Sequence, residues 1–337
     1  MPARPTSRVT PIAPMMPTII DTLCDIIRAG SSFLLVTHVE PDGDGIGAAL
    51  ALAHALRQLR KSARVWLPKG VPDKYRFLPG TDEVVLEGGP EPTVLVLDCD
   101  NAERLGEALP TVRQCERVVN IDHHAATEPF GDVNWLDPAS PAAGFQVLQL
   151  IRALGAPITR EIAVCLYCAV GTDSGFFRYS NTTPELLRAA AELIEAGADP
   201  KAIAEATLDR YPPAMVRLAG CALASLTVRL DGSAAVTVLT NEDYGRAGTR
   251  QTEGIIDFLR TVAGVDLLVL MREDAEGWRV SLRSLGAVDV GAAVRKLGGG
   301  GHAAAAGCTL QGDVGAVWSV LEGVLREARG AAARNEA

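Results

Sequence analysis

Three of the four short apolar runs in the first half of the chain end directly at a histidine or an aspartate. The runs cover residues 32–37, 63–67, 93–97 and 117–121, and stretches with helical periodicity lie between or after them. This alternation predicts an α/β fold with a parallel sheet and helices on both faces. Since the carboxyl ends of parallel strands meet at one edge of a sheet, we expect His38, Asp98 and Asp122 to lie together there.

The length of the chain and a change of pattern predict two domains. A chain of 337 residues usually forms more than one core. We expect a parallel-sheet domain over residues 18–208, a linker helix over 209–224 and a smaller mixed α/β domain over 225–329, with residues 330–337 frayed. Further helices are expected at 44–60, 101–109, 142–154, 160–170, 184–196, 200–208, 289–297 and 312–329, and strands of the second domain at 226–230, 234–240, 265–271 and 278–283, with a glycine loop at 298–301.

Composition excludes several classes of protein. Hydrophobic residues at 48% and charged residues at 22% are typical of a soluble globular protein. A net charge of −9 argues against a groove for long duplex nucleic acid, although not against a short phosphorylated substrate. No apolar run reaches the ~18 residues of a membrane span. Residues 1–17 lack the apolar core of a signal peptide, so we expect a cytoplasmic protein without membrane contact.

The seven cysteines indicate neither disulfides nor zinc. Their number is odd and the chain is long, which is unlike a disulfide framework. Cys165 and Cys168 have CxxC spacing, but they lie in an apolar helical run without a second pair. We therefore expect both to be buried and reduced.

The first motif, at residues 38–44, is open to several interpretations. It overlaps a loose G-x-G-x-x-A dinucleotide fingerprint, but Asp42 and Asp44 would repel a pyrophosphate at the helix N-terminus. A calcium loop beginning at Asp42 would need a ligand at Ile46. Helix capping by Asp44 and metal binding remain. Only metal binding accounts for His38 and both aspartates together.

Three later motifs carry the same residue types. Asp98 can form an Asx-turn or bind a metal, and Asp173 can cap a helix or bind a metal. In the segment Asp122-His123-His124, two adjacent histidines point in different directions. One can therefore bind metal while the other faces a substrate; two solvent-exposed histidines are the alternative. Imidazole and carboxylate groups in this combination are typical of a site for two divalent cations.

In this order and spacing the motifs resemble the DHH phosphoesterase family. The matching segments are His38-x-x-x-Asp42-x-Asp44, Asp98, Asp122-His123-His124 and Asp173. The glycine-rich segment 299–307 and the upstream segment 281–284 resemble the DHH-associated C-terminal domain. The likeness spans about residues 20–329, and the segment 252–254 looks most like the NrnA-like oligoribonuclease and pAp phosphatase branch.

The resemblance implies a ligand set and roles for individual residues. His38, Asp42 and Asp98 would bind one Mn²⁺, with Mg²⁺ or Co²⁺ as substitutes. The ligands of a second Mn²⁺ would be Asp44, Asp98, His123 and Asp173, so that Asp98 bridges the pair. Besides Asp98, the catalytic residues would be Asp122, which orients an imidazole, and His124, which contacts the scissile phosphate. The substrate would be bound in the second domain by Arg283, Ser284, Gly299, Gly300, Gly301 and His302.

The resemblance also implies an activity and partners. Such an enzyme would hydrolyse very short RNAs (nanoRNA and dinucleotides) to mononucleotides and remove the 3′-phosphate of 3′-phosphoadenosine 5′-phosphate (pAp). Its partners would be short RNA or nucleotide substrates and a second copy of itself in a homodimer. A RecJ-like single-strand exonuclease, a family II inorganic pyrophosphatase and a non-catalytic nucleotide-binding regulator are the alternatives.

Overall fold

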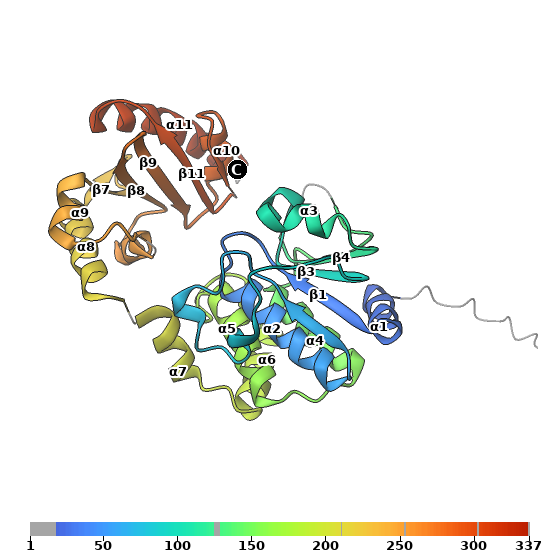
Figure 1. The fold of residues 1–337 in the computed structure, drawn as a ribbon. Coiled ribbons are helices and arrows are strands. Elements are labelled where there is room, and N and C mark those ends of the chain that lie inside the picture. The colour runs from blue at the N-terminus through green and yellow to red at the C-terminus, as the bar shows by residue number, and fades with distance from the viewer. Residues whose placement is uncertain (1–17, 125–128, 210, 253, 302, 336–337) are drawn as a thin grey trace, which may run out of the picture. The chain divides into compact units, whose positions relative to one another are not determined.

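The computed structural model describes residues 18–124, 129–209, 211–252, 254–301 and 303–335. The chain divides into two compact units, residues 1–210 and 211–337. Each unit has its own sheet and its own hydrophobic core (Figure 1). No helix within the described ranges is long and apolar enough to cross a membrane.

The first unit is built on a five-stranded sheet in which every neighbouring pair is parallel. This confirms the predicted fold class. The strand order is β2-β1-β3-β4-β5, with β1 (Ser32–Val36), β2 (Ser62–Val65), β3 (Thr93–Leu97), β4 (Arg117–Asp122) and β5 (Val133–Leu136). Strand β5 was not predicted from the sequence, because four residues with a central asparagine give no apolar run.

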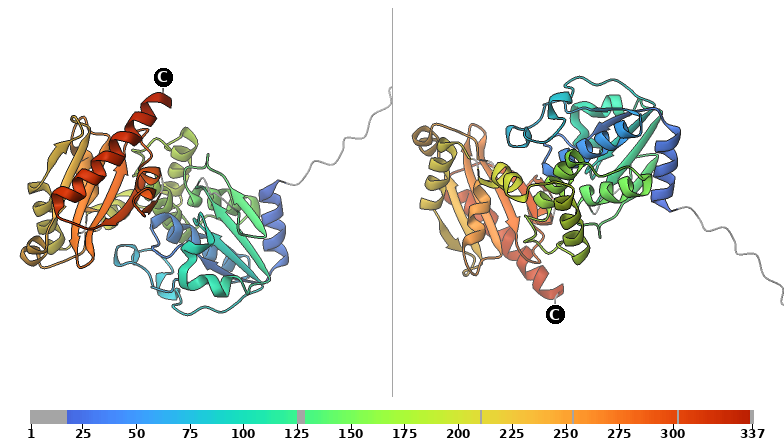
Figure 2. Two further views of the ribbon diagram at one scale, coloured as in Figure 1. Left: turned by 90° about the horizontal axis from the view of Figure 1, so that it is seen from above. Right: turned by 90° about the horizontal axis from the view of Figure 1, so that it is seen from below.

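Helices cover both faces of this sheet (Figures 1 and 2). One face packs against the larger helices, which are α1 (Ile19–Ala29), α2 (Gly43–Gln58), α4 (Ala143–Leu154), α5 (Arg160–Asp173) and α6 (Pro184–Glu195). The other face packs against η3 (Ala102–Ala108) and α3 (Leu109–Val112). The helix predicted at 101–109 is instead a 3₁₀ segment, because Gly106 adopts φ 50 inside it.

Small residues let α2 and α5 approach closely. A Cβ at Gly47 would lie 2.4 Å from the carbonyl oxygen of Cys165, so only glycine fits there. Cys165 and Cys168 are buried and free on α5, as predicted. The remaining short elements of this unit are η1 (Asp73–Tyr75), η2 (Thr81–Glu83), α7 (Pro200–Ala204) and η4 (Glu205–Asp209).

The second unit contains a six-stranded mixed sheet of order β10-β11-β9-β8-β7-β6. Only the pair β7–β8 is parallel among the five neighbouring pairs. Its strands are β6 (Thr227–Arg229), β7 (Ala234–Leu239), β8 (Leu267–Asp274), β9 (Gly277–Ser284), β10 (Gly300–Gly301) and β11 (Ala305–Leu310). The glycine segment predicted as a loop therefore includes a short strand.

Two helical layers enclose this second sheet (Figure 2). Helices α10 (Val290–Arg295) and α11 (Val314–Asn335) pack on one face. Helices α8 (Pro213–Ala224), α9 (Asn241–Ala247) and η5 (Ile255–Thr261) pack on the other. The prediction of a frayed tail after residue 329 was wrong, because α11 continues to Asn335 and Ala332 packs against the core. Helix α8 packs within the second unit, and the predicted boundaries of domains and linker stay predictions.

Candidate metal centre

The residues predicted to bind metal come from the ends of several core elements of the first unit. His38, Asp98 and His123 follow β1, β3 and β4, whose carboxyl ends share one edge of the parallel sheet. The N-terminus of α2 and the C-terminus of α5 contribute the remaining aspartates at the same edge. The structure brings together all six predicted ligands, namely His38, Asp42, Asp44, Asp98, His123 and Asp173.

The two aspartates of the first motif have different neighbours. Oδ1 of Asp42 accepts the N–H groups of Asp44 at 3.0 Å and Gly45 at 3.1 Å. Asp42 therefore caps α2, and the alternative that Asp44 caps this helix is wrong. Asp44 is 1% exposed and accepts the N–H groups of Ala143 at 2.7 Å and Gly144 at 2.8 Å. It thereby satisfies the N-terminal donors of α4, which has no capping side chain of its own.

Asp98 lies between two groups of ligands. Its φ is 55, in the left-handed region that is uncommon for residues other than glycine, asparagine and aspartate. Its N–H donates to the carbonyl of Ile121 at 2.9 Å, which extends the β3–β4 ladder by one step. Oδ2 lies 3.8 Å from Nε2 of His38, and Oδ1 lies 3.6 Å from Nε2 of His123. The two oxygens of one carboxylate therefore face two different imidazoles.

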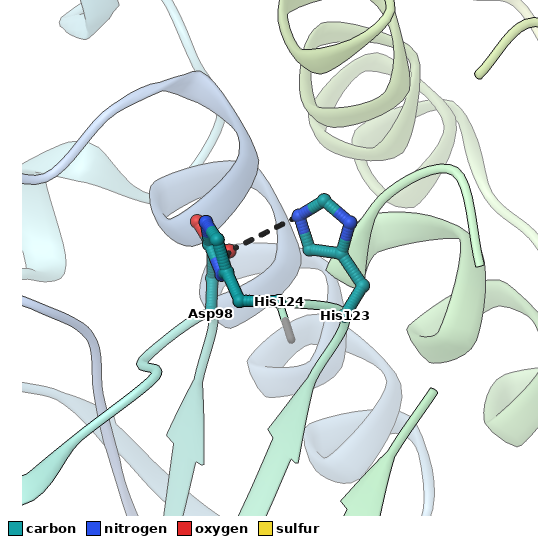
Figure 3. A group of neighbouring side chains, drawn as sticks. All are labelled: Asp98, His123 and His124. Carbon is teal, nitrogen blue, oxygen red and sulfur yellow. Dashed lines mark ion pairs between the residues drawn. The ribbon is translucent and has the colours of Figure 1, made fainter. Parts of the chain in front are cut away.

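Carboxylates surround the imidazole of His123. Nε2 of His123 lies 3.7 Å from Asp44, 3.6 Å from Asp98 and 3.6 Å from Asp173. Figure 3 shows the ring facing the carboxylate of Asp98. Nδ1 lies 3.3 Å from the carbonyl of Ser140; donation from Nδ1 would leave Nε2 with its lone pair free for a metal.

Two atoms at the centre of this cluster fit a cation. Oδ1 of Asp98 and Nε2 of His123 are buried and have no hydrogen-bond partner among the described residues. Buried polar atoms are nearly always satisfied, so such a pair indicates a ligand. The donor set contains oxygen and imidazole nitrogen without thiolate, which suits a hard or borderline divalent ion.

The electrostatics of the cluster also favour bound cations. Burial, reinforced by nearby carboxylates, raises the pKa values of Asp44 and Asp98 well above the usual range. The same causes raise the pKa of Asp173 to about 7. Burial lowers the pKa of His38 to about 4 in spite of the neighbouring Asp42, so its ring is neutral at pH 7 and able to bind a metal.

His124 has a different environment from His123. Its Nδ1 donates to Oδ1 of Asp122 at 2.8 Å and lies 3.5 Å from Asp98. Although burial opposes protonation, Asp122 and Asp98 raise the pKa of His124 to about 9. The ring is therefore a cation at pH 7, which suits a partner for developing negative charge better than a metal ligand.

Some residues that shape the centre were not predicted. Asn181 donates to the main-chain carbonyl of Asp173 at 3.2 Å and to its carboxylate at 3.3 Å, and Asn120 donates to the carbonyl of Cys99 at 3.1 Å. Asn120 is an amide between the apolar residues Val119 and Ile121 of β4, which is a signal the sequence offers. The contacts to Ser140 and to the start of α4 have one weaker signal, a helix that begins without a capping residue.

The predicted substrate residues of the second unit lie on adjoining strands. Arg283 lies opposite Ala305 in the β9–β11 pair, and Gly300 and Gly301 pair with the other edge of β11. A Cβ at Gly299 would lie 2.4 Å from the carbonyl of Gly307, so the close approach requires glycine. The Ser284 hydroxyl donates to the carbonyl of Gly286 within its own turn. His302 lies outside the described residues.

Known proteins match both units. The model of the DHH family, N-terminal domain, matches residues 32–170, and the DHHA1 domain matches residues 231–333. The chain is 38% identical over 300 residues to the bifunctional oligoribonuclease and PAP phosphatase NrnA of Thermus thermophilus, covering 87% of this chain and 89% of the relative. It is 27% identical to the protein of the same name from Bacillus subtilis, covering 85% and 92%.

A solved structure agrees with these matches. An exopolyphosphatase-related protein from Bacteroides fragilis superposes with a TM-score of 0.87 at 27% identity, covering 93% of this chain and 97% of that one. The likeness thus extends through both units, and the imidazole and carboxylate groups meet where the first unit is expected to bind cations. The chain therefore belongs to the DHH phosphoesterase family of metal-dependent hydrolases.

Proposed function

We propose that this protein hydrolyses very short oligoribonucleotides to mononucleotides and removes the 3′-phosphate of pAp, using two Mn²⁺ ions. The similarity to the NrnA enzymes supports the substrate class. One observation carries the two-ion proposal: the two oxygens of Asp98 face separate ligand groups. A bridging carboxylate between two cations requires this arrangement.

Each group supplies one ion with protein ligands in this proposal. His38, Asp42 and Asp98 would hold the first ion. The second ion would be held by Asp44, Asp98, His123 and Asp173. When bound, such a pair would activate a water and stabilise charge on the phosphoryl oxygens. Mg²⁺ or Co²⁺ would serve as substitutes, because the oxygen and nitrogen donors accept either ion.

Two further residues act on the substrate rather than on the metals. His124 donates from Nδ1 to Asp122, and its positive charge is available to the scissile phosphate. Asp122 keeps the protonated ring in one orientation. The part of the substrate distant from the broken bond is bound in the second unit by Arg283, Ser284, the segment Gly299–Gly301 and His302. We further propose that the protein acts as a homodimer in the cytoplasm.

A product time course tests the proposed function. The protein is incubated with Mn²⁺ and 5′-labelled RNAs of increasing length, with pAp in parallel, and Asp98→Ala serves as the inactive control. Rapid turnover of the shortest RNAs and of pAp is the expected result. Sustained degradation of long single strands would favour the RecJ-like alternative, and turnover of inorganic pyrophosphate alone would favour the pyrophosphatase. Binding without turnover would favour the regulator.

A further inference from the structure

A small cavity of about 150 Å³ opens beside the metal centre, within the first unit. Three segments line it: the turn after β1, the turn after β2 and the end of η3. His38 forms part of its wall, so the cavity adjoins the ligand group of His38, Asp42 and Asp98. A chemical group attached to a phosphate at the metals would therefore reach it.

The walls and the rim differ in chemistry. Val39, Leu67, Pro68 and Leu105 give the cavity apolar surfaces. Lys69 and Glu107, both exposed, add charged groups of opposite sign at its edge. An apolar cavity with a polar edge suits a nucleobase joined to a phosphorylated sugar, because the base has apolar faces while its edges and the adjoining groups are polar. The cavity is smaller than the several hundred Å³ of a whole-ligand pocket, so it would hold one ring system.

The shape of the cavity depends on a backbone conformation that only glycine adopts readily. Gly106 has φ 50, and a Cβ there would lie 2.2 Å from Cγ1 of Val39. The N–H of Val39 donates to the carbonyl of Arg104 at 2.8 Å, which ties the turn after β1 to η3. The two walls are thus held together by direct contact, and the slot exists before any ligand arrives.

We propose that this cavity binds the second nucleoside of a dinucleotide substrate, the one that pAp lacks. The scissile phosphorus of a dinucleotide carries two ester bonds, so a nucleoside remains on each side of it. The 3′-phosphate of pAp carries one ester bond and has a nucleoside on one side only. The cavity is therefore a specificity subsite for oligonucleotides and plays no part in pAp hydrolysis. This inference rests on the proposed function.

The test compares two substrates in variants that fill the slot from opposite walls. Val39→Phe adds bulk from the turn after β1, and Pro68→Trp adds bulk from the turn after β2. In both variants the ratio of kcat/KM for a dinucleotide to kcat/KM for pAp is expected to fall on the order of 10- to 100-fold, the worth of one base contact. Val133→Phe is the matched control, a half-buried valine at the opposite end of the sheet, and keeps the wild-type ratio.

A second arm uses the wild-type protein alone and does not depend on the folding of a variant. Dinucleotides that lack the base on one side or on the other are compared with the complete dinucleotide. One of the two abasic substrates is expected to lose about tenfold or more in kcat/KM because its slot stays unfilled. In Val39→Phe the penalty for that missing base disappears.

Different results test nucleoside binding in the cavity and the proposed hydrolytic activity. Wild-type turnover of dinucleotide and pAp tests the function itself. An unchanged substrate ratio in both filling variants would overturn the subsite. Equal losses on both substrates would overturn it too, because the cavity would then support the metal centre instead of the second nucleoside.

Discussion

Removal of the metal ions should make the stability of this protein strongly dependent on pH between 6.5 and 9. The metal centre gathers the buried carboxylates of Asp44 and Asp98 with the half-buried Asp173, and one protonated histidine, His124, lies beside them. In the metal-free protein, His124 provides compensating positive charge. Raising the pH removes that charge while the carboxylates remain.

The direction in which stability changes with pH follows from the pKa shifts of His124 and Asp173. The folded-state pKa of His124 is about 9, above its ordinary value of 6.5, so its contribution is fully present below pH 6.5 and is lost as the pH rises through 9. The pKa of Asp173 is raised to about 7, and a carboxyl group with a raised pKa also destabilises the fold as the pH rises through that value. The lowered pKa of His38 acts in the opposite sense only below pH 6.5.

The pKa shift of His124 sets an upper limit on the loss of stability between pH 6.5 and 9. A shift from 6.5 to about 9 corresponds to at most ~3 kcal/mol. For a unit of this size that amounts to a fall in Tm of roughly 6–12 °C across the window. Mn²⁺ bound as proposed would neutralise the carboxylates, so its stabilisation of the protein should be larger at pH 9 than at pH 6.5.

Thermal unfolding of chelated and Mn²⁺-loaded protein over a pH series provides the measurement. His124→Gln should flatten the profile of the metal-free protein. His54→Gln, which removes a histidine outside the metal centre, should keep the wild-type profile. A metal-free Tm that stays level or rises between pH 6.5 and 9 would show that the charge of His124 does not stabilise the metal-free fold.

Four other outcomes are expected. Chelation should abolish hydrolysis and readdition of Mn²⁺ should restore it, as followed by product release; turnover in excess chelator would contradict the metal dependence. Asp98→Ala should lose more activity than His124→Ala, whose loss should be on the order of 10²–10³ in kcat, because only Asp98 faces both ligand groups. Arg283→Ala should lower kcat/KM for a dinucleotide far more than for bis-p-nitrophenyl phosphate, which has no distal phosphate; equal losses would show a structural role. Asn120→Ala should weaken Mn²⁺ affinity in calorimetry and cost about 1–3 kcal/mol of stability, because the Cys99 carbonyl next to Asp98 loses its buried donor.

The strand ends were predictable from the sequence because their pattern is local. Each of β1, β3 and β4 contains an apolar run with a functional residue one or two positions after the strand, so the pattern predicted both the element and the position of the side chain. The parallel arrangement then brings His38, Asp98 and His123 to one edge. No long-range information was needed for this convergence.

The parts that were missed depend on contacts distant in sequence or on backbone angles. The carboxylate of Asp44 meets the start of α4 about a hundred residues later, and periodicity does not encode such a pairing. The left-handed conformation of Asp98 likewise leaves no trace in hydrophobic pattern. By contrast, the continuation of α11 through the alanines after Gly330 had a signal, since alanine is the strongest helix former.

The left-handed conformation of Asp98 and the crowding of carboxylates have a common explanation in bound cations. A left-handed non-glycine residue persists only where its surroundings hold it, and the N–H contact to Ile121 and the Asn120 contact to the next peptide provide that constraint. Neutral N–H donors stabilise a buried carboxylate by about 1–3 kcal/mol each, which does not balance several like charges in contact. Divalent ions would balance them and would use both oxygens of Asp98 at once. A conformation that is unfavourable for the metal-free chain would thus be stabilised by bound cations, and metal binding and folding of this edge of the sheet should be coupled.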